Sequence, residues 1–176
     1  ALSHLTHLDL SNNELNGSIP TSLGNCTNYS LFLPCLDGWK TREFGEPLHF
    51  ADLPHLVYLN LGNNHLLGGI PSSIGALAEL AYLDMSVNDL NGSIPPSIGN
   101  CTKLSSLDLS YYNLFLPCLV NRKTREFDEH LHFADLPHLV YLNLGDNHLL
   151  GVIPSSIGAL AKLENLDLSG NDLNGS

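Results

Sequence analysis

A leucine pattern that recurs every 24 residues constrains this chain more than any other feature. The pattern reads L-x-x-L-x-L-x-x-N-x-L-x-G-x-I-P, and its 24-residue step separates Leu56 from Leu80, Leu80 from Leu104, and Leu139 from Leu163. A repeat of this length indicates a solenoid, in which each coil buries its apolar edge only against neighbouring coils. Such a chain presents a long binding surface and does not close around a reaction.

Each copy of the pattern predicts one short strand. Within L-x-x-L-x-L the last positions alternate between apolar and polar residues, which is typical of a half-buried strand. We expect the leucines to point into the solenoid and the intervening residues to face an open concave sheet. The six copies begin at Leu5, Leu56, Leu80, Leu104, Leu139 and Leu163.

The asparagine that follows each strand should also point inward. There it would bond the backbone of adjacent coils, because an unpaired buried polar group costs about 1–3 kcal/mol. Glycine and proline of the G-x-I-P segment, as at Gly92 to Pro95, then bend the chain onto the convex side. Tyr112 stands where the fourth copy should carry this asparagine, which is a local fault.

Two intervals do not fit the repeat, and we predict irregular loops there, at residues 28–49 and 112–132. The first interval lacks a strand after Thr27. Either Phe32 to Leu36 forms a poor strand in its place or the sheet is interrupted. Pro34 cannot donate to a ladder, so it favours interruption. A larger duplication surrounds these loops, because residues 48–80 and 131–163 differ at only three positions.

Composition narrows the possible partners. Hydrophobic residues make up 43% of the chain and charged residues 14%, which suits a continuous core and excludes disorder. A net charge of −11 argues against nucleic acid, whose phosphates need a basic surface. No run of 18 apolar residues and no signal peptide is visible. Because both ends fall inside a repeat, we interpret residues 1–176 as one domain truncated at both ends.

The repeats resemble the plant extracellular leucine-rich-repeat class. The segment Leu83-Asp-Met-Ser-Val-Asn88-Asp-Leu90-Asn-Gly92-Ser-Ile94-Pro95 fits that consensus almost throughout, and the resemblance covers residues 1–27, 50–111 and 133–176. It implies an α/β solenoid: a right-handed leucine-rich-repeat superhelix with a parallel concave sheet and short 3-10 or loop segments on the convex side.

The resemblance also implies a function. The chain is similar to ectodomains of receptor-like kinases and receptor-like proteins. These bind a peptide or protein ligand at the cell surface, often with a co-receptor, in signalling or defence. This predicts a secreted or cell-surface glycoprotein, attached to a membrane only through parts outside this chain. One alternative is an enzyme inhibitor similar to the polygalacturonase-inhibiting proteins. A second is ice binding, although the threonines form no ladder.

Two columns of outward side chains are the candidate ligand site. Tyrosines beside an acidic column could hold a peptide, because tyrosine supplies amphipathic contact area at low entropy cost. The alternative is that the Asp or Asn is repeat consensus that only hydrates the sheet. The candidate residues are His7, Asp9, Tyr58, Asn60, Tyr82, Asp84, Asp108, Tyr141 and Asn143, and Ser106, Asn165 and Asp167 complete the two columns.

Sequons of the N-x-S/T type suit a glycoprotein of the secretory pathway. The expected acceptors are Asn16, Asn25, Asn28, Asn91 and Asn100, and a sixth sequon, at Asn174, ends the chain. Several belong to the Asn-Gly-Ser consensus and would arise without selection for a glycan. Asn25 and Asn100, in Asn-Cys-Thr, are the better candidates.

Metal binding, cofactors and catalysis are not expected. The cysteines lack C-x-x-C spacing, which disfavours zinc, and the histidines around residues 128–132 fit a solvated loop. Cys26 and Cys101 occupy equivalent convex positions, where a buried free thiol is the default. The pairs Cys26–Cys35 and Cys101–Cys118 are an alternative in an oxidising compartment. No motif brings together a nucleophile, a base and oxyanion donors, so we predict a protein that is not an enzyme.

Overall fold

A computed structural model describes residues 3–19, 50, 53–111 and 135–174. The predicted irregular loops at 28–49 and 112–132 lie outside the described residues. So do Asn25, Asn28, Cys26, Cys35 and Cys118, together with Tyr112.

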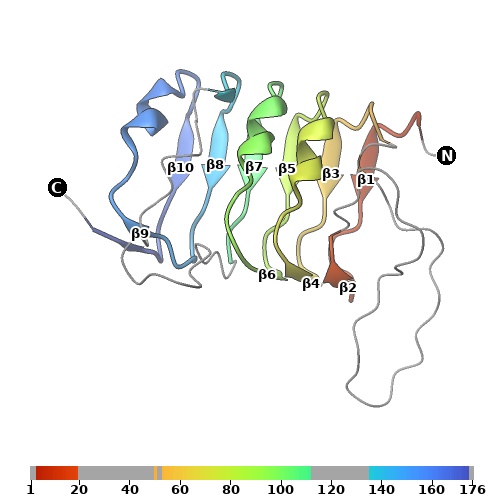
Figure 1. Ribbon diagram of the computed structural model, residues 1–176, viewed down its shortest axis with the longest axis horizontal. Coiled ribbons are helices and arrows are strands. Elements are labelled where there is room, and N and C mark those ends of the chain that lie inside the picture. The colour runs from red at the N-terminus through yellow and green to blue at the C-terminus, as the bar shows by residue number, and fades with distance from the viewer. Residues whose placement is uncertain (1–2, 20–49, 51–52, 112–134, 175–176) are drawn as a thin grey trace, which may run out of the picture.

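Six parallel strands form the main sheet, one from each leucine pattern (Figure 1). Each is three residues long with a leucine in the middle. The strands lie in the order β1-β3-β5-β7-β8-β10. Their bounds are β1 His7–Asp9, β3 Tyr58–Asn60, β5 Tyr82–Asp84, β7 Ser106–Asp108, β8 Tyr141–Asn143 and β10 Asn165–Asp167. The predicted parallel sheet is therefore confirmed.

The sheet is continuous across both irregular intervals, which corrects the sequence analysis. β1 pairs directly with β3, with His7 opposite Tyr58, so no strand from residues 32–36 stands between them and the sheet is not interrupted. Phe50 and Leu53 are buried, and the bonds Leu53 N–H to Phe50 O and Leu56 N–H to Leu53 O repeat those that link Ile74, Leu77 and Leu80 in the next coil. The coil that begins at Leu5 is thus completed by Phe50 and Leu53, and the missing strand leaves no gap.

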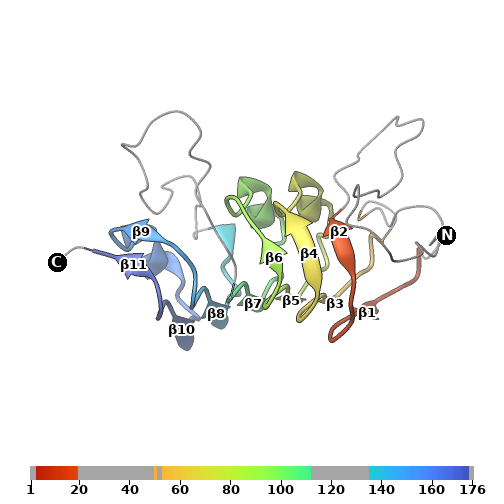
Figure 2. The same ribbon diagram turned by 90° about the horizontal axis from the view of Figure 1, so that it is seen from below.

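Short strands of two further sheets follow the main strands, near their carboxyl ends (Figures 1 and 2). The sequence analysis missed them, because their residues, such as Asn16-Gly17-Ser18, show no alternation of apolar and polar side chains. One sheet contains β2 (Asn16–Ser18), β4 (His65–Gly68) and β6 (Asp89–Leu90), and the other contains β9 (Leu150–Gly151) and β11 (Asp172–Leu173). These strands are also parallel, so in these coils the backbone is paired with the neighbouring coil a second time.

The convex side carries 3-10 helices, as predicted. They are η2 (Ser72–Ala76), η3 (Pro96–Asn100) and η5 (Ser155–Ala159), and each follows a proline with extended backbone. η2 and η3 pack so closely that a Cβ placed on Gly75 would lie 2.5 Å from the carbonyl oxygen of Ser97. Glycine at this position therefore sets how near two coils approach on the convex side.

The core is a column of leucines that is complete only in the middle of the solenoid. Leu59, Leu83, Leu107 and Leu142, the central residues of four adjacent main strands, are fully buried. Their counterpart Leu166 in β10 is 43% exposed. The difference follows from the architecture, because each coil is covered only by the coils on either side of it.

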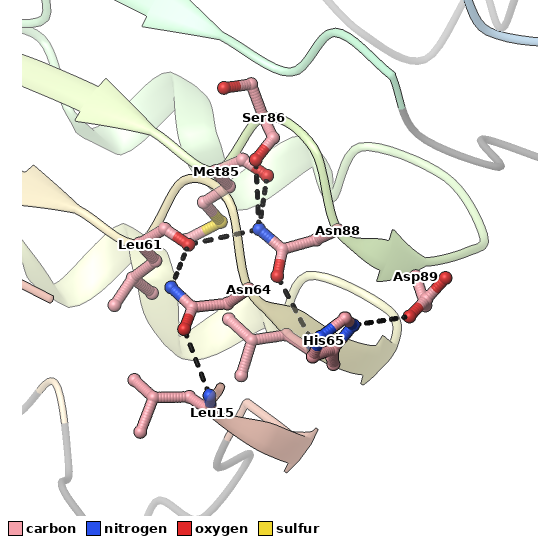
Figure 3. A network of polar contacts seen from close by, with 9 residues as sticks. Leu15, Leu61, Asn64, His65, Met85, Ser86, Asn88 and Asp89 are labelled. Carbon is pink, nitrogen blue, oxygen red and sulfur yellow. Dashed lines mark hydrogen bonds and ion pairs between the residues drawn. The ribbon is translucent and has the colours of Figure 1, made fainter. Parts of the chain in front are cut away.

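Inward asparagines join successive coils (Figure 3). Asn88 donates to the carbonyl oxygens of Leu61, Met85 and Ser86 at 2.9–3.1 Å, and its own oxygen accepts from the Leu66 amide at 3.0 Å. Leu61 and Leu66 belong to the preceding coil, so one buried side chain satisfies backbone groups of two coils. The predicted inward role is confirmed at the equivalent positions Asn64, Asn147 and Asn171.

The residue before each inward asparagine has left-handed backbone. The non-glycine residues at this position, Asn12, Asn63, Val87 and Asp146, have φ of +52° to +56°. Tyr111 precedes Tyr112 in place of an asparagine and has φ +53°. Asparagine and aspartate tolerate this conformation, whereas a β-branched residue does not. Val87 is therefore a strained position, and it is 44% exposed.

Replacing Asn88 by alanine is expected to lower the free energy of unfolding by about 3 kcal/mol or more, because a buried amide and several carbonyls lose their partner. Asn171→Ala is the matched control. Asn171 makes the equivalent bonds but is only half-buried in the last coil, so water replaces part of what is lost. Guanidinium chloride unfolding of both variants measures the difference, and equal losses would contradict the inter-coil role.

Replacing Val87 by asparagine is expected to raise the free energy of unfolding by about 1 kcal/mol, the cost of left-handed backbone at an ordinary residue. The reverse change, Asn63→Val, should destabilise, since it adds the same strain and removes a 2.9 Å bond to Asn12. Thermal unfolding of both variants tests this. A lower melting temperature for Val87→Asn would show that the valine side chain contributes more than its backbone strain costs.

Candidate functional site

The main sheet places the predicted site residues in two straight columns on its outward face, here called the concave face. The first column contains His7, Tyr58, Tyr82, Ser106, Tyr141 and Asn165, and the second contains Asp9, Asn60, Asp84, Asp108, Asn143 and Asp167. Each residue is paired in register with its column neighbour. Because parallel strands lie about 4.8 Å apart, the side chains of one column are in contact range.

Three rings of the first column stack. The rings of Tyr58 and Tyr82 lie 4.4 Å apart at an interplanar angle of 8°, and His7 stacks on Tyr58 at 5.8 Å and 17°. The strand spacing matches the distance between stacked rings, so register pairing alone is enough to form the stack. It gives the concave face a continuous aromatic surface at its N-terminal end.

Ser106 ends this stack, and the tyrosine after it behaves differently. Tyr141 lies beyond Ser106 and donates from its hydroxyl to Asp108 Oδ2 at 3.2 Å. Tyr58 and Tyr141 occupy the same place in the two duplicated segments, yet one is stacked and the other is tied to a carboxylate. Their neighbours decide this: Tyr58 lies between His7 and Tyr82, whereas Tyr141 lies between Ser106 and Asn165.

The second column has a structural role as well as a possible binding role. Each Asp or Asn accepts through Oδ1 from the backbone amide two residues later, at 2.9–3.0 Å. Where the column residue is aspartate, that later residue is a serine whose hydroxyl also donates, as Ser86 does to Asp84 at 2.7 Å. Where it is asparagine, the later residue is glycine. Oδ1 of each column residue is therefore engaged within its own coil, whereas Oδ2 of Asp84 and of Asp108 contacts other column residues.

Electrostatics follow from these contacts. Burial, with Asp84 and other neighbours, raises the pKa of Tyr82, and burial is also the main cause of a raised pKa at Tyr141. At Asp9 and Asp167 the hydrogen bonds from Ser11 and Ser169 lower the carboxyl pKa. Tyr82 and Tyr141 therefore act as hydrogen-bond donors beside the carboxylates of Asp84 and Asp108.

The described sequon asparagines lie off the concave face. Asn16 is in β2, Asn91 directly follows β6, Asn100 ends η3, and Asn174 follows β11; all four are exposed. Among the residues that the structure describes, no sequon falls on the six main strands. A glycan at any of these four positions would leave both columns open.

The cysteine prediction can be checked at Cys101. Cys101 is a buried free thiol that donates to the carbonyl of Ile74 at 3.4 Å, and burial raises its pKa to about 11. The free-thiol expectation is confirmed there, and the Cys101–Cys118 alternative is wrong in this structure.

Within the described ranges, no group of three or more His, Cys, Asp or Glu is arranged to hold a metal. In the same ranges no helix is long and apolar enough to cross a bilayer.

Comparison with known proteins supports the architecture. Leucine-rich-repeat family models match residues 4–26, 55–77, 79–101 and 126–173. A comparison with curated proteins found no match.

Several solved structures resemble this one. The plant peptide hormone receptor RGFR1, in complex with RGF2, is 29% identical with a TM-score of 0.70, over 98% of this chain and 22% of that chain. The leucine-rich-repeat ectodomain of the Arabidopsis thaliana receptor kinase GASSHO1/SCHENGEN3, in complex with CASPARIAN STRIP INTEGRITY FACTOR 2, is 29% identical with a TM-score of 0.71, over 99% and 19%. The BIR3–SERK2 complex of Arabidopsis thaliana gives 37% and 0.58, over 68% and 58%.

These matches confirm the predicted fold class. The chain spans 19–22% of the length of the two receptors compared first.

Removing the hydroxyl of the serine two residues after a column aspartate should raise the pKa of that aspartate's carboxyl group toward its ordinary value. Ser169→Ala is expected to do this at Asp167, because the Ser169 side chain is the main cause of the lowered pKa. A lowered pKa stabilises the fold above the unfolded-state pKa, and this stabilisation is lost as pH falls through the folded-state pKa. The variant should therefore lose less stability in acid. Carboxyl ¹³C titration by NMR measures the shift, with Ser72→Ala in η2 as control; an unmoved titration would contradict the assignment.

Proposed function

Because the chain belongs to the leucine-rich-repeat family and has the fold of plant receptor kinase ectodomains, we propose that it binds a peptide or protein ligand on its concave face. It is then a recognition module of a receptor-like kinase or receptor-like protein, and it acts by binding without catalysing a reaction. The observation that carries the proposal is the register-aligned column of His7, Tyr58 and Tyr82, whose rings stack on an otherwise polar, outward sheet face.

The physical argument is that this face offers both contact area and directional partners. Aromatic side chains contribute much of the binding energy in protein interfaces, and stacked rings lose little conformational entropy when a ligand covers them. Beside them, the Oδ2 atoms of Asp84 and Asp108 can accept hydrogen bonds from a ligand backbone or side chain. The exposed sequons lie elsewhere, so glycosylation would not block this face.

The similar structures support the same choice of partner. Two are receptors in complex with RGF2 and with CASPARIAN STRIP INTEGRITY FACTOR 2, and a third is the complex of BIR3 with SERK2. By analogy we propose a peptide or protein ligand, with a co-receptor as a further partner. We also propose an extracellular location, modification of the exposed sequons and a role in signalling or defence.

The test is a selection of binders from a displayed library of random 12-residue peptides against the full chain. Replacing both Tyr58 and Tyr82 by alanine should weaken the selected peptides at least about tenfold, since buried aromatic contacts in interfaces typically contribute 2 kcal/mol or more. Tyr111→Ala is the matched control, because Tyr111 is 60% exposed and lies outside both columns. Binding measured by fluorescence anisotropy that survives the double change, or depends on Tyr111, would place recognition elsewhere.

A further inference from the structure

One position of the first column, here called the Ser106 step, carries a small side chain between two tyrosines. Ser106 pairs in register with Tyr82 on one side and Tyr141 on the other. Tyr82 stacks on Tyr58 at 4.4 Å, whereas Ser106, on its other side, brings no ring to it. The side of Tyr82 toward Ser106 therefore offers an aromatic face to a planar group placed over the serine.

Two carboxylates flank this step. Asp84 and Asp108 are register partners in the second column, so they lie on strands about 4.8 Å apart. Like charges on directly paired positions repel each other. Each Oδ1 is held by a serine, Ser86 or Ser110, and the remaining oxygens face the first column. Among the described residues, Asp84 Oδ2 accepts a single long hydrogen bond, from the Tyr82 hydroxyl at 3.5 Å, and Asp108 Oδ2 accepts from Tyr141 and Asn143 at 3.2 Å.

The six described main strands supply no lysine or arginine to the concave face. Its twelve column positions include four aspartates and neither lysine nor arginine. The two basic residues in the described part of the chain are engaged elsewhere: Lys103 pairs with Glu79 at 2.5 Å, and Lys162 contacts His138 at 2.9 Å. Neither described lysine therefore supplies a positive charge to the Ser106 step, and a cationic ligand would complement its two carboxylates.

We propose that the Ser106 step binds the guanidinium group of an arginine in an extended, basic peptide ligand. This deepens the proposed function and rests on it. The guanidinium plane lies against Tyr82 over the small Ser106 side chain, and its N–H groups donate to Asp84 Oδ2 and Asp108 Oδ2. A planar, delocalised cation suits this site better than an ammonium, because it stacks on a ring and donates in two directions at once.

Comparing an arginine peptide with an uncharged analogue shows whether binding depends on the charge or only on the shape of the side chain. The probes are the capped pentapeptide Gly-Ser-Arg-Ser-Gly and its analogue with citrulline, which has the same outline without the charge. Titrated into the full chain and followed by NMR, the arginine peptide should perturb the signals of Tyr82, Asp84 and Asp108. Its affinity should exceed that of the citrulline peptide at least about tenfold, as expected for charge-assisted hydrogen bonds with a cation–π contact, and should fall with added salt.

Matched variants locate the effect. Asp108→Asn and Asp167→Asn each remove one charge from the same column, and an asparagine oxygen can still accept the bonds now made to Ser110 or Ser169. Only Asp108→Asn should reduce arginine-peptide binding, again by about tenfold. Ser106→Tyr should abolish it by continuing the aromatic stack over the site. Circular dichroism establishes that each variant is folded.

The outcomes separate the two proposals. Equal binding of the arginine and citrulline peptides, equal effects of Asp108→Asn and Asp167→Asn, or perturbations confined to other faces would overturn the arginine site. Selection of library peptides that need Tyr58 and Tyr82 but show no arginine preference would do the same while leaving peptide recognition by the concave face intact. If no peptide binds the concave face in either experiment, both proposals are wrong.

Discussion

The hydrogen bonds of the inward asparagines are the constraint on which the rest of this structure depends. The chain turns sharply between a main strand and the second strand that follows it, and that turn leaves backbone amides and carbonyls pointing into an apolar interior. Asn88 satisfies groups of its own coil and of the preceding one, including Leu61 and Leu66. Because the same bonds recur at Asn64, Asn147 and Asn171, successive coils are held at one register. The leucine column supplies apolar burial, and the asparagines fix the alignment.

Alignment of the coils is what makes the concave face a surface. A side chain on one main strand meets its counterpart on the next at the distance of stacked rings, so the register of the strands brings Tyr58 and Tyr82 together as a stacked pair. The same spacing brings Asp84 beside Asp108. The spacing of the strands, which does not depend on the ligand, therefore determines which outward residues lie close enough to act together. The outward residues can change without disturbing it, since Ser106 and Tyr141 are accommodated equally well on adjacent strands.

The duplicated segments show how much depends on the neighbouring coil. Residues 48–80 and 131–163 are nearly identical, and both contribute a tyrosine and an asparagine to the columns. Tyr58 is sandwiched between His7 and Tyr82, while Tyr141 donates to Asp108. Identical sequence thus produces two different local surfaces. In a solenoid the binding properties of a coil belong to the pair of coils that meet there, because no coil carries its own core or its own surface environment.

The sequence by itself determined the solenoid, the main strands, the inward asparagines and the two outward columns, because each of these follows from periodicity within one coil. The tertiary structure decided what depends on contacts between coils. It showed that β1 pairs directly with β3, since Phe50 and Leu53 complete the first coil, and that a second row of short strands exists. It also showed that the serine after each column aspartate occupies one carboxylate oxygen, and that Tyr82 is stacked on one side and faces Ser106 on the other. Periodicity fixes which residues point outward, but only the register between coils decides which of them lie together.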